Sequence, residues 1–225
     1  MNLVKNKYTA ANPDESLADF TITSQASKVR QAYREMDEAA VIGLERLERE
    51  DGIVASCKLG CSHCCQFHIV TNIAEAVTLA QYIKKQLSAD QVEELRIRTQ
   101  KWHAWDSSRP GRYPTENIDT KIDFSDYIHC CPLLVNGKCI VYPVRPSVCR
   151  THYVCSQPLL CLAANNPKSE LEPPIVMKSI LEMTNSFSLE IKELIEKAGI
   201  DFSRSIMLLP HWLAIQMDWD FAISP

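Results

Sequence analysis

All ten cysteines of this 225-residue chain lie between positions 57 and 161, and this clustering constrains its fold and function more than any other feature. They form three groups: Cys57, Cys61, Cys64 and Cys65; Cys130 and Cys131; and Cys139, Cys149, Cys155 and Cys161. Thiols gathered in this way are either oxidised in pairs or bound to a metal. A role as small buried hydrophobic side chains explains one or two cysteines, but not ten in one half of a chain.

The choice between disulfides and a metal depends on the cellular compartment. The N-terminal segment contains no apolar stretch followed by a small-residue cleavage site, so we do not expect a secretory signal. No apolar run approaches the length that spans a bilayer. We therefore expect a cytoplasmic protein, in which thiols are kept reduced. A chain of this length also buries a core without the help of disulfides, which favours the metal.

Composition argues against several other classes of function. The net charge of −4 gives no indication of nucleic-acid binding, which usually needs a basic surface. Only six glycines are present, and no phosphate-binding loop or dinucleotide fingerprint can be built from them. We therefore expect neither nucleic acid nor a membrane as a partner, and neither a Rossmann-type enzyme nor a P-loop ATPase.

Apolar residues recur at intervals of three and four along much of the chain, which is the pattern of amphipathic helices. The segments with this pattern are residues 29–47, 76–87, 92–105 and 177–198. Thr71–Glu75 and Ser88–Gln91 each place a capping side chain before such a segment. Gly52 and Gly199 follow two of the segments and are suited to helix C-termini.

One short segment has the character of strands. Leu133–Tyr142 contains Asn136-Gly137, which supplies the two positive φ angles of a type I′ turn, so we predict a β-hairpin. Residues 145–150 are predicted to form a short helix, and residues 106–120 a loop. The fold is therefore predicted to be mainly α: a helical domain over residues 26–225 with one small β-hairpin and cysteine-rich metal-binding loops. A poorly patterned lead-in is expected over residues 1–25.

The spacing of the first cysteines suits a metal. Cys57-x₃-Cys61-x₂-Cys64 lets one tight loop direct several thiolates at one centre, and Gly60 permits the turn. Adjacent cysteines cannot easily direct both side chains at one tetrahedral ion. Cys64 and Cys65 are therefore expected to serve different centres, unless one is spare. Eight or more thiolates exceed one Cys₄ site, so the sequence favours two metal centres, or one polynuclear cluster and a zinc ion.

Four separated motifs resemble those of the YkgJ-type cysteine-cluster family. They are CKLGCSHCC at residues 57–65, Cys131-Pro132-Leu133-Leu134, Cys139-Ile140-Val141-Tyr142 and Arg145-Pro146-Ser147-Val148-Cys149-Arg150. The resemblance implies binding of zinc or iron, or of an iron–sulfur cluster. The metal-binding positions that it implies are Cys57, Cys61, Cys64, Cys65, Cys131, Cys139, Cys149 and Cys155. The first gap holds three residues here instead of two. Cys130 and Cys161 fall outside the pattern, although Cys161 could replace Cys155.

Charged and imidazole side chains accompany the cysteines. Arg145 and Arg150 could offset the negative charge of several thiolates, or form ordinary salt bridges. Any of four histidines could replace a thiolate, although a hydrogen bond to a ligand or an exposed ring is the commoner role for each. These are His63, His68, His129 and His152.

Three functions follow as expectations. The first is a redox or catalytic protein with an iron–sulfur cluster, and the second is a structural zinc module that presents a surface to a protein partner. The third rests on the resemblance, because the family includes flagellin lysine methylases: an S-adenosylmethionine-dependent enzyme that modifies proteins. The sequence leaves open which of these applies and whether the chain catalyses a reaction at all.

Overall fold

The computed structural model describes residues 22–108, 129–164 and 169–221. Most of the predicted lead-in, and the predicted loop from residue 109 onward, lie outside these residues. The described part is mainly helical, as predicted. Its α-helices are α2 (Ile22–Asp51), α3 (Ile73–Gln86), α4 (Ala89–Ser108), α5 (Ser147–Thr151), α6 (Leu159–Ala163), α7 (Lys178–Lys197) and α8 (Leu209–Gln216), and its 3₁₀ helices are η1 (His63–Gln66), η3 (Tyr142–Val144) and η4 (Phe202–Ser205).

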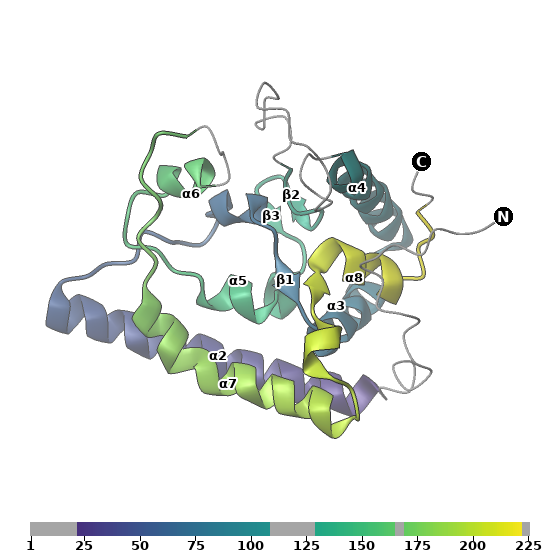
Figure 1. Ribbon diagram of the computed structural model, residues 1–225, viewed down its shortest axis with the longest axis horizontal. Coiled ribbons are helices and arrows are strands. Elements are labelled where there is room, and N and C mark those ends of the chain that lie inside the picture. The colour runs from purple at the N-terminus through teal and green to yellow at the C-terminus, as the bar shows by residue number, and fades with distance from the viewer. Residues whose placement is uncertain (1–21, 109–128, 165–168, 222–225) are drawn as a thin grey trace.

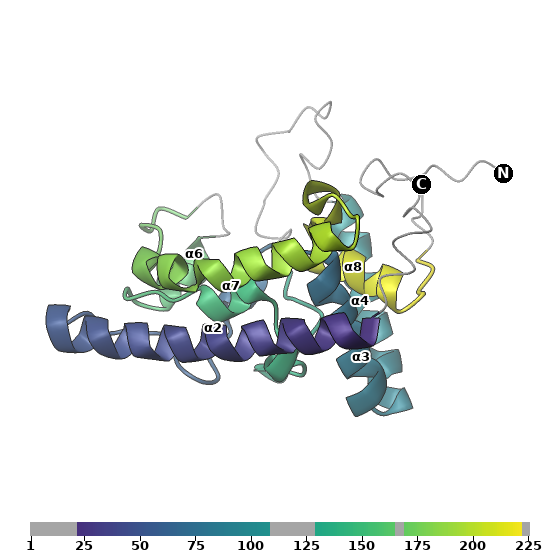
Figure 2. The same cartoon turned by 90° about the horizontal axis from the view of Figure 1, so that it is seen from below.

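The two long helices α2 and α7 lie side by side along one edge of the molecule (Figures 1 and 2). Their facing sides carry the apolar residues that the periodicity predicted, including the fully buried Met36 and Ile180. Gly43 lies at the closest approach, because a Cβ atom added there would be 2.8 Å from both Ile180 Cδ1 and Met183 Sδ. The chain leaves α2 at Gly52, whose φ of 66° suits a residue without a Cβ.

The other helices form a second layer of the core. α8 packs against both α3 and α4, and buries Trp212 and Leu213 between them and the rest of the core. The capping predictions are confirmed at both helix starts. Asn72 accepts a hydrogen bond from the Glu75 amide at 3.0 Å, and Ser88 and Gln91 exchange reciprocal side-chain-to-backbone bonds of 3.3 and 2.9 Å. The C-terminal apolar segment that includes α8 belongs to the core.

Two small antiparallel sheets complete the described fold. The predicted hairpin consists of β2 (Leu134–Val135) and β3 (Lys138–Cys139), joined by Asn136 and Gly137 with φ angles of 50° and 73°. The second sheet pairs β1 (Val70–Thr71) with β4 (Met207–Leu208) and was not predicted. The expectation of a single hairpin was therefore incomplete, because strands of two residues show no periodicity.

The cysteine-bearing segments lie at the left and in the middle of the view in Figure 1. α6 lies at the left, α5 and the β2–β3 hairpin lie in the middle, and α3, α4 and α8 lie at the right. The long helices α2 and α7 thus support the loops that carry the thiols. Within the described ranges, no helix has both the length and the apolar character needed to cross a membrane.

The contact at Gly43 gives a test of the close packing between α2 and α7. Gly43→Leu should lower the free energy of unfolding by about 2 kcal/mol, because a larger side chain would overpack the contact with Ile180 and Met183. Ile42→Leu, at the exposed neighbouring position, should change it by less than about 0.5 kcal/mol. Urea unfolding followed by circular dichroism measures both. Equal effects of the two substitutions would show that α2 and α7 do not pack closely at Gly43.

Candidate metal centre

The two cysteine-rich regions meet in space. The amide of Cys131 donates a 2.7 Å hydrogen bond to the carbonyl of Cys65, and the amide of Leu134 returns a 3.0 Å bond to the carbonyl of Cys131. Leu134 then pairs with Cys139 across the hairpin. All ten cysteines are free thiols. The arrangement has both features that metal binding needs, namely reduced sulfur atoms and convergence of distant loops.

Four thiols from four separate segments gather around the hairpin, and we call them the hairpin group: Cys65, Cys131, Cys139 and Cys149. Burial raises the pKa of Cys131, and the charge of Cys139 contributes to the same rise. Together these effects bring the pKa of Cys131 to about 12. Burial also raises the pKa of Cys149, with added contributions from the charges of Cys131 and Cys139. The charges of Cys131 and Cys149 act in turn on Cys65. These charge effects link the four thiols to one another, and the charge of Cys64 acts on Cys131, Cys139 and Cys149 as well.

Backbone amides point at sulfur atoms of the hairpin group. The amide of Leu133 donates to the sulfur of Cys131, and that of Val141 donates to the sulfur of Cys139. In both cases the donor lies two residues after the cysteine. Such N–H···S bonds lower the pKa of the thiol, because they stabilise the thiolate that a metal requires. The backbone of the Cys-Pro-Leu and Cys-Ile-Val segments therefore stabilises the thiolate forms of Cys131 and Cys139.

A second set of four thiols lies beside the first, and we call it the loop group: Cys57, Cys61, Cys64 and Cys161. The amide of Val154 donates to Cys57 Sγ at 3.4 Å. Burial raises the pKa of Cys57, and the charges of Cys61 and Cys64 raise it further. Burial raises the pKa of Cys161, and the charges of Cys57, Cys64 and Cys61 contribute to the same rise. Together these effects bring the pKa of Cys161 to about 11. Cys161 is carried to the group by α6, which packs against η1.

Cys64 and Cys65 lie where the two groups meet. The thiol of Cys65 donates to the sulfur of Cys64, which lowers the pKa of Cys64 to about 7 and raises that of Cys65. The charge of Arg145 also favours the Cys64 thiolate. Cys64 acts electrostatically on thiols of both groups, including Cys149 and Cys161. The border between the groups therefore runs through two neighbouring residues of η1.

Cys155 and Cys130 have other contacts. Cys155 Sγ is 3.7 Å from the carbonyl oxygen of Ile175, and its amide donates to the same oxygen at 3.1 Å. Its side chain packs against the small core cluster that contains Met177 and Ile180. Cys130 is exposed. The ligand role of Cys155 implied by the family resemblance stays a prediction.

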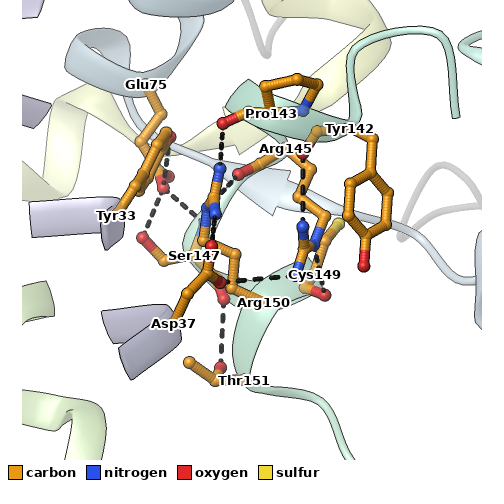
Figure 3. Close-up of polar contacts among 10 residues, drawn as sticks. All are labelled: Tyr33, Asp37, Glu75, Tyr142, Pro143, Arg145, Ser147, Cys149, Arg150 and Thr151. Atoms are coloured by element: carbon orange, nitrogen blue, oxygen red, sulfur yellow. Dashed lines mark hydrogen bonds and ion pairs between the residues drawn. The ribbon is translucent and has the colours of Figure 1, made fainter. Parts of the chain in front are cut away.

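Arg150 anchors the segment that carries Cys149 (Figure 3). Its side chain is 2% exposed and forms a 2.5 Å ion pair with Asp37 of α2. It also donates to the carbonyl oxygens of Arg145 at 2.8 Å and Pro143 at 2.5 Å, and its guanidinium lies 4.1 Å from the ring centroid of Tyr33. These contacts fix α5 and the preceding turn against α2.

Arg145 lies closer to the thiols. Its guanidinium stacks 3.9 Å from the ring centroid of Tyr142, pairs with Asp37 at 3.4 Å, and donates to the Cys149 carbonyl at 3.4 Å (Figure 3). Burial raises the pKa of Cys139, and the charges of Arg145 and Arg150 oppose this effect. Both expected roles of the arginines are therefore present: they form salt bridges and they favour nearby thiolates.

Glu75 was expected only as a helix-capping residue, but it joins three helices. Its buried carboxylate accepts hydrogen bonds from Tyr33 of α2 at 3.1 Å and from Thr71 and Asn72 before α3 at 2.7 and 3.0 Å. It also accepts bonds from the Ser147 amide at 2.7 Å and the Ser147 hydroxyl at 2.5 Å (Figure 3). The start of α5 is thereby fixed two residues before Cys149.

Among the four candidate histidines, His152 has an unsatisfied nitrogen. Its Nε2 atom is buried and has no hydrogen-bond partner among the described residues. Burial lowers its pKa, so the imidazole is neutral at neutral pH, which is the form that binds metals. His68 and His129 contact the ring of Trp105 at centroid distances of 5.6 and 5.7 Å, and His63 lies on η1 beside Cys64.

The chemical type of the side chains suits a thiolate metal centre, but the positions of the described side chains do not yet form one. In the described part of the chain, no three or more His, Cys, Asp or Glu side chains are arranged so as to hold a metal ion. A tetrahedral Cys₄ zinc site needs metal–sulfur distances of about 2.3 Å, and hence sulfur atoms about 3.8 Å apart. The two groups each supply four thiols, and amides already donate to sulfur atoms in both. Binding would therefore require deprotonation and an inward shift of the side chains.

Comparisons of the chain with family models, with curated proteins and with solved structures found no match. The resemblance to the YkgJ-type family therefore stays a prediction, and the candidate site stands on the residues and contacts described above.

The Cys65–Cys64 hydrogen bond predicts an unusual titration in metal-free protein. The Cys64 thiolate should form as the pH rises through about 7, so Cys64 should be alkylated at a lower pH than Cys139. Cys65→Ala removes the donor and should raise the pKa of Cys64. Mass spectrometry after brief iodoacetamide treatment measures both, with Cys130→Ala as the control. An unchanged Cys64 titration in the Cys65 variant would contradict the hydrogen bond.

The Arg150 contacts predict a large loss of stability on substitution. Arg150→Met should lower the free energy of unfolding by about 2 kcal/mol, because it leaves two carbonyls and part of Asp37 without their buried donor. Arg49→Met removes an exposed ion pair with Glu50 and should cost less than about 0.5 kcal/mol. Urea unfolding compares the two. Similar losses would show that Arg150 does not anchor α5.

Proposed function

We propose that this protein is a cysteine-cluster metalloprotein that binds zinc or an iron–sulfur cluster through the thiolates of the hairpin group. The observation that supports the proposal is the backbone hydrogen bond between Cys131 and Cys65, together with the pairing of Leu134 with Cys139, which brings the two cysteine-rich regions together. Four free thiols placed together by unrelated parts of a chain have little value for packing alone, since a cysteine packs as an ordinary small apolar residue.

The surroundings of the hairpin group support the same proposal. Four thiolates around a divalent ion leave an excess of negative charge, which the guanidinium groups of Arg145 and Arg150 would offset. The amides of Leu133 and Val141 hold two of the sulfur atoms as acceptors. Glu75 and Arg150 fix the backbone around Cys149. A bound zinc ion would stabilise this fold, and an iron–sulfur cluster would in addition exchange electrons.

The choice between the two metals rests on the cysteine count and the family resemblance. Both zinc and iron–sulfur clusters accept four thiolates, so the hairpin group alone suits either. The number of thiols and the resemblance to the YkgJ-type family favour an iron–sulfur cluster. We place the protein in the cytoplasm, where free thiols persist. A methylase-like activity and a structural role toward a protein partner stay predictions.

Metal analysis of two variants tests the proposal. Protein purified without oxygen should contain zinc or iron, and an iron–sulfur cluster should also give acid-labile sulfide and visible absorption. Cys139→Ser should lose about half of the metal or more, because it removes a buried member of the hairpin group. Cys130→Ser, at an exposed cysteine, should keep the wild-type content. Elemental analysis and absorption spectra measure these contents.

Two results would count against the proposal. One is wild-type protein that is folded but free of both iron and zinc after anaerobic purification and metal loading. The other is equal metal content in the Cys139 and Cys130 variants. Chelation of the metal should also lower the melting temperature, because the binding free energy contributes to folding.

A further inference from the structure

A cavity of about 280 Å³ lies between β1, α5, α7 and the segment that joins η4 to β4. The ten cysteines all belong to the described residues, and none of them lines this cavity, so it is separate from the candidate metal centre. Four polar side chains of its wall are more than nine-tenths buried: Thr71, Asn72, Glu75 and Thr151. Polar side chains that converge on a cavity are characteristic of a small-molecule site.

Glu75 brings a negative charge to the wall of the cavity. Its carboxylate accepts five hydrogen bonds, and all five donors are neutral: three hydroxyls, one side-chain amide and one backbone amide. A carboxyl group that only accepts is in its charged form. Arg150 acts on Glu75 electrostatically, but its guanidinium is ion-paired with Asp37. The charge of Glu75 is therefore only partly balanced, and its field extends into the cavity.

Three hydroxyl groups of the wall can only accept further hydrogen bonds, because a hydroxyl has a single hydrogen. Thr71 and Ser147 donate theirs to Glu75 at 2.7 and 2.5 Å. Thr151 donates its hydrogen to the carbonyl oxygen of Ser147 at 3.1 Å (Figure 3). Lone pairs beside a negative charge favour a ligand group that donates hydrogen bonds and is positively charged.

The remainder of the wall is mostly apolar and determines what the rest of such a ligand can be. Val70, Val148 and Ile206 are exposed apolar residues of this wall, and the buried Ile191 and the ring of Phe202 complete it. The volume lies just below the range of about 300–1,000 Å³ that is usual for drug-sized ligands. The cavity is therefore suited to a small ligand with a short apolar body.

Lys192 of α7 is close to the cavity but is engaged elsewhere. Its ammonium group lies 5.8 Å from the ring centroid of Phe202 and pairs with Glu196 at 3.6 Å. Lys192 is not among the described residues that line the cavity. Its charge is offset by Glu196, so it does not supply the cation that the field of Glu75 favours.

We propose that this cavity binds a small organic ammonium ion. The ammonium group donates hydrogen bonds to the hydroxyl oxygens of Thr71, Ser147 and Thr151 in the field of Glu75, and the apolar body lies against the apolar wall. The site is additional to the proposed metal centre and does not require that a metal be bound.

Two-dimensional NMR of the backbone amides of the full-length protein tests the selection for charge. n-Butylammonium should shift the resonances of residues that line the cavity, with a dissociation constant in the millimolar range. 1-Butanol has the same size and shape without the charge. It should bind about tenfold more weakly or less, because it cannot form charge-assisted hydrogen bonds as a donor. Ammonium chloride at the same ionic strength controls for charge without the apolar body.

A pair of substitutions on α7 tests the location. Ser188 lines the cavity and is partly exposed, so Ser188→Lys would place a competing ammonium group at the wall without disturbing the core. It should weaken the binding of n-butylammonium by about tenfold or more. Ser186→Lys adds the same charge at an exposed position that does not line the cavity, and should change the binding by less than about twofold.

Three results would overturn this inference: no shifts with n-butylammonium, equal binding of n-butylammonium and 1-butanol, or equal losses in the two α7 variants. Glu75 itself is not substituted, because it also joins three helices. The proposed metalloprotein function is judged separately by metal content. Protein that contains metal but does not bind n-butylammonium would leave that function intact, and metal-free protein that binds the amine would leave the cavity site intact.

Discussion

The ion pair between the buried Arg150 and the partly exposed Asp37 is the interaction on which the cysteine region depends. It joins α5 to the long helix α2, and the same guanidinium also binds the carbonyls of Pro143 and Arg145. On the opposite side, Glu75 accepts both the amide and the hydroxyl of Ser147. Two charged side chains of opposite sign therefore fix a helix of only five residues. Such a short helix is not stable alone, so Cys149 owes its position to these contacts.

The thiols are held by rigid parts of the fold in different ways. Cys139 is placed by a hairpin whose turn residues have the required positive φ angles, and Cys131 by backbone bonds to Cys65 and Leu134. Cys161 is placed by the docking of α6 on η1. Two adjacent residues of η1, Cys64 and Cys65, link the groups, because their side chains interact with each other.

The sequence predicted what depends on local chemistry. Asn136-Gly137 specifies its turn, Ser88 and Gln91 specify a helix start, and the α2 and α7 periodicities specify buried faces, because each of these acts within a few residues. The β1–β4 pairing and the triple role of Glu75 depend on segments distant in the chain, and no local pattern encodes them. Cys155 and Cys161 both follow Cys149 within one stretch of the chain, and no local pattern tells which of them lies nearer the other thiols. Only the Val154–Val176 bridge and the docking of α6 distinguish their surroundings.

The low pKa of Cys64 has a consequence for the order in which ligands are acquired. At neutral pH the pKa of Cys64, about 7, favours its thiolate more than those of Cys57, Cys131 and Cys161, whose pKa values burial raises. A soft cation bound as we propose would therefore meet its first negative sulfur at Cys64. The positive charge of that cation would lower the pKa of the neighbouring thiols, because it stabilises their thiolates.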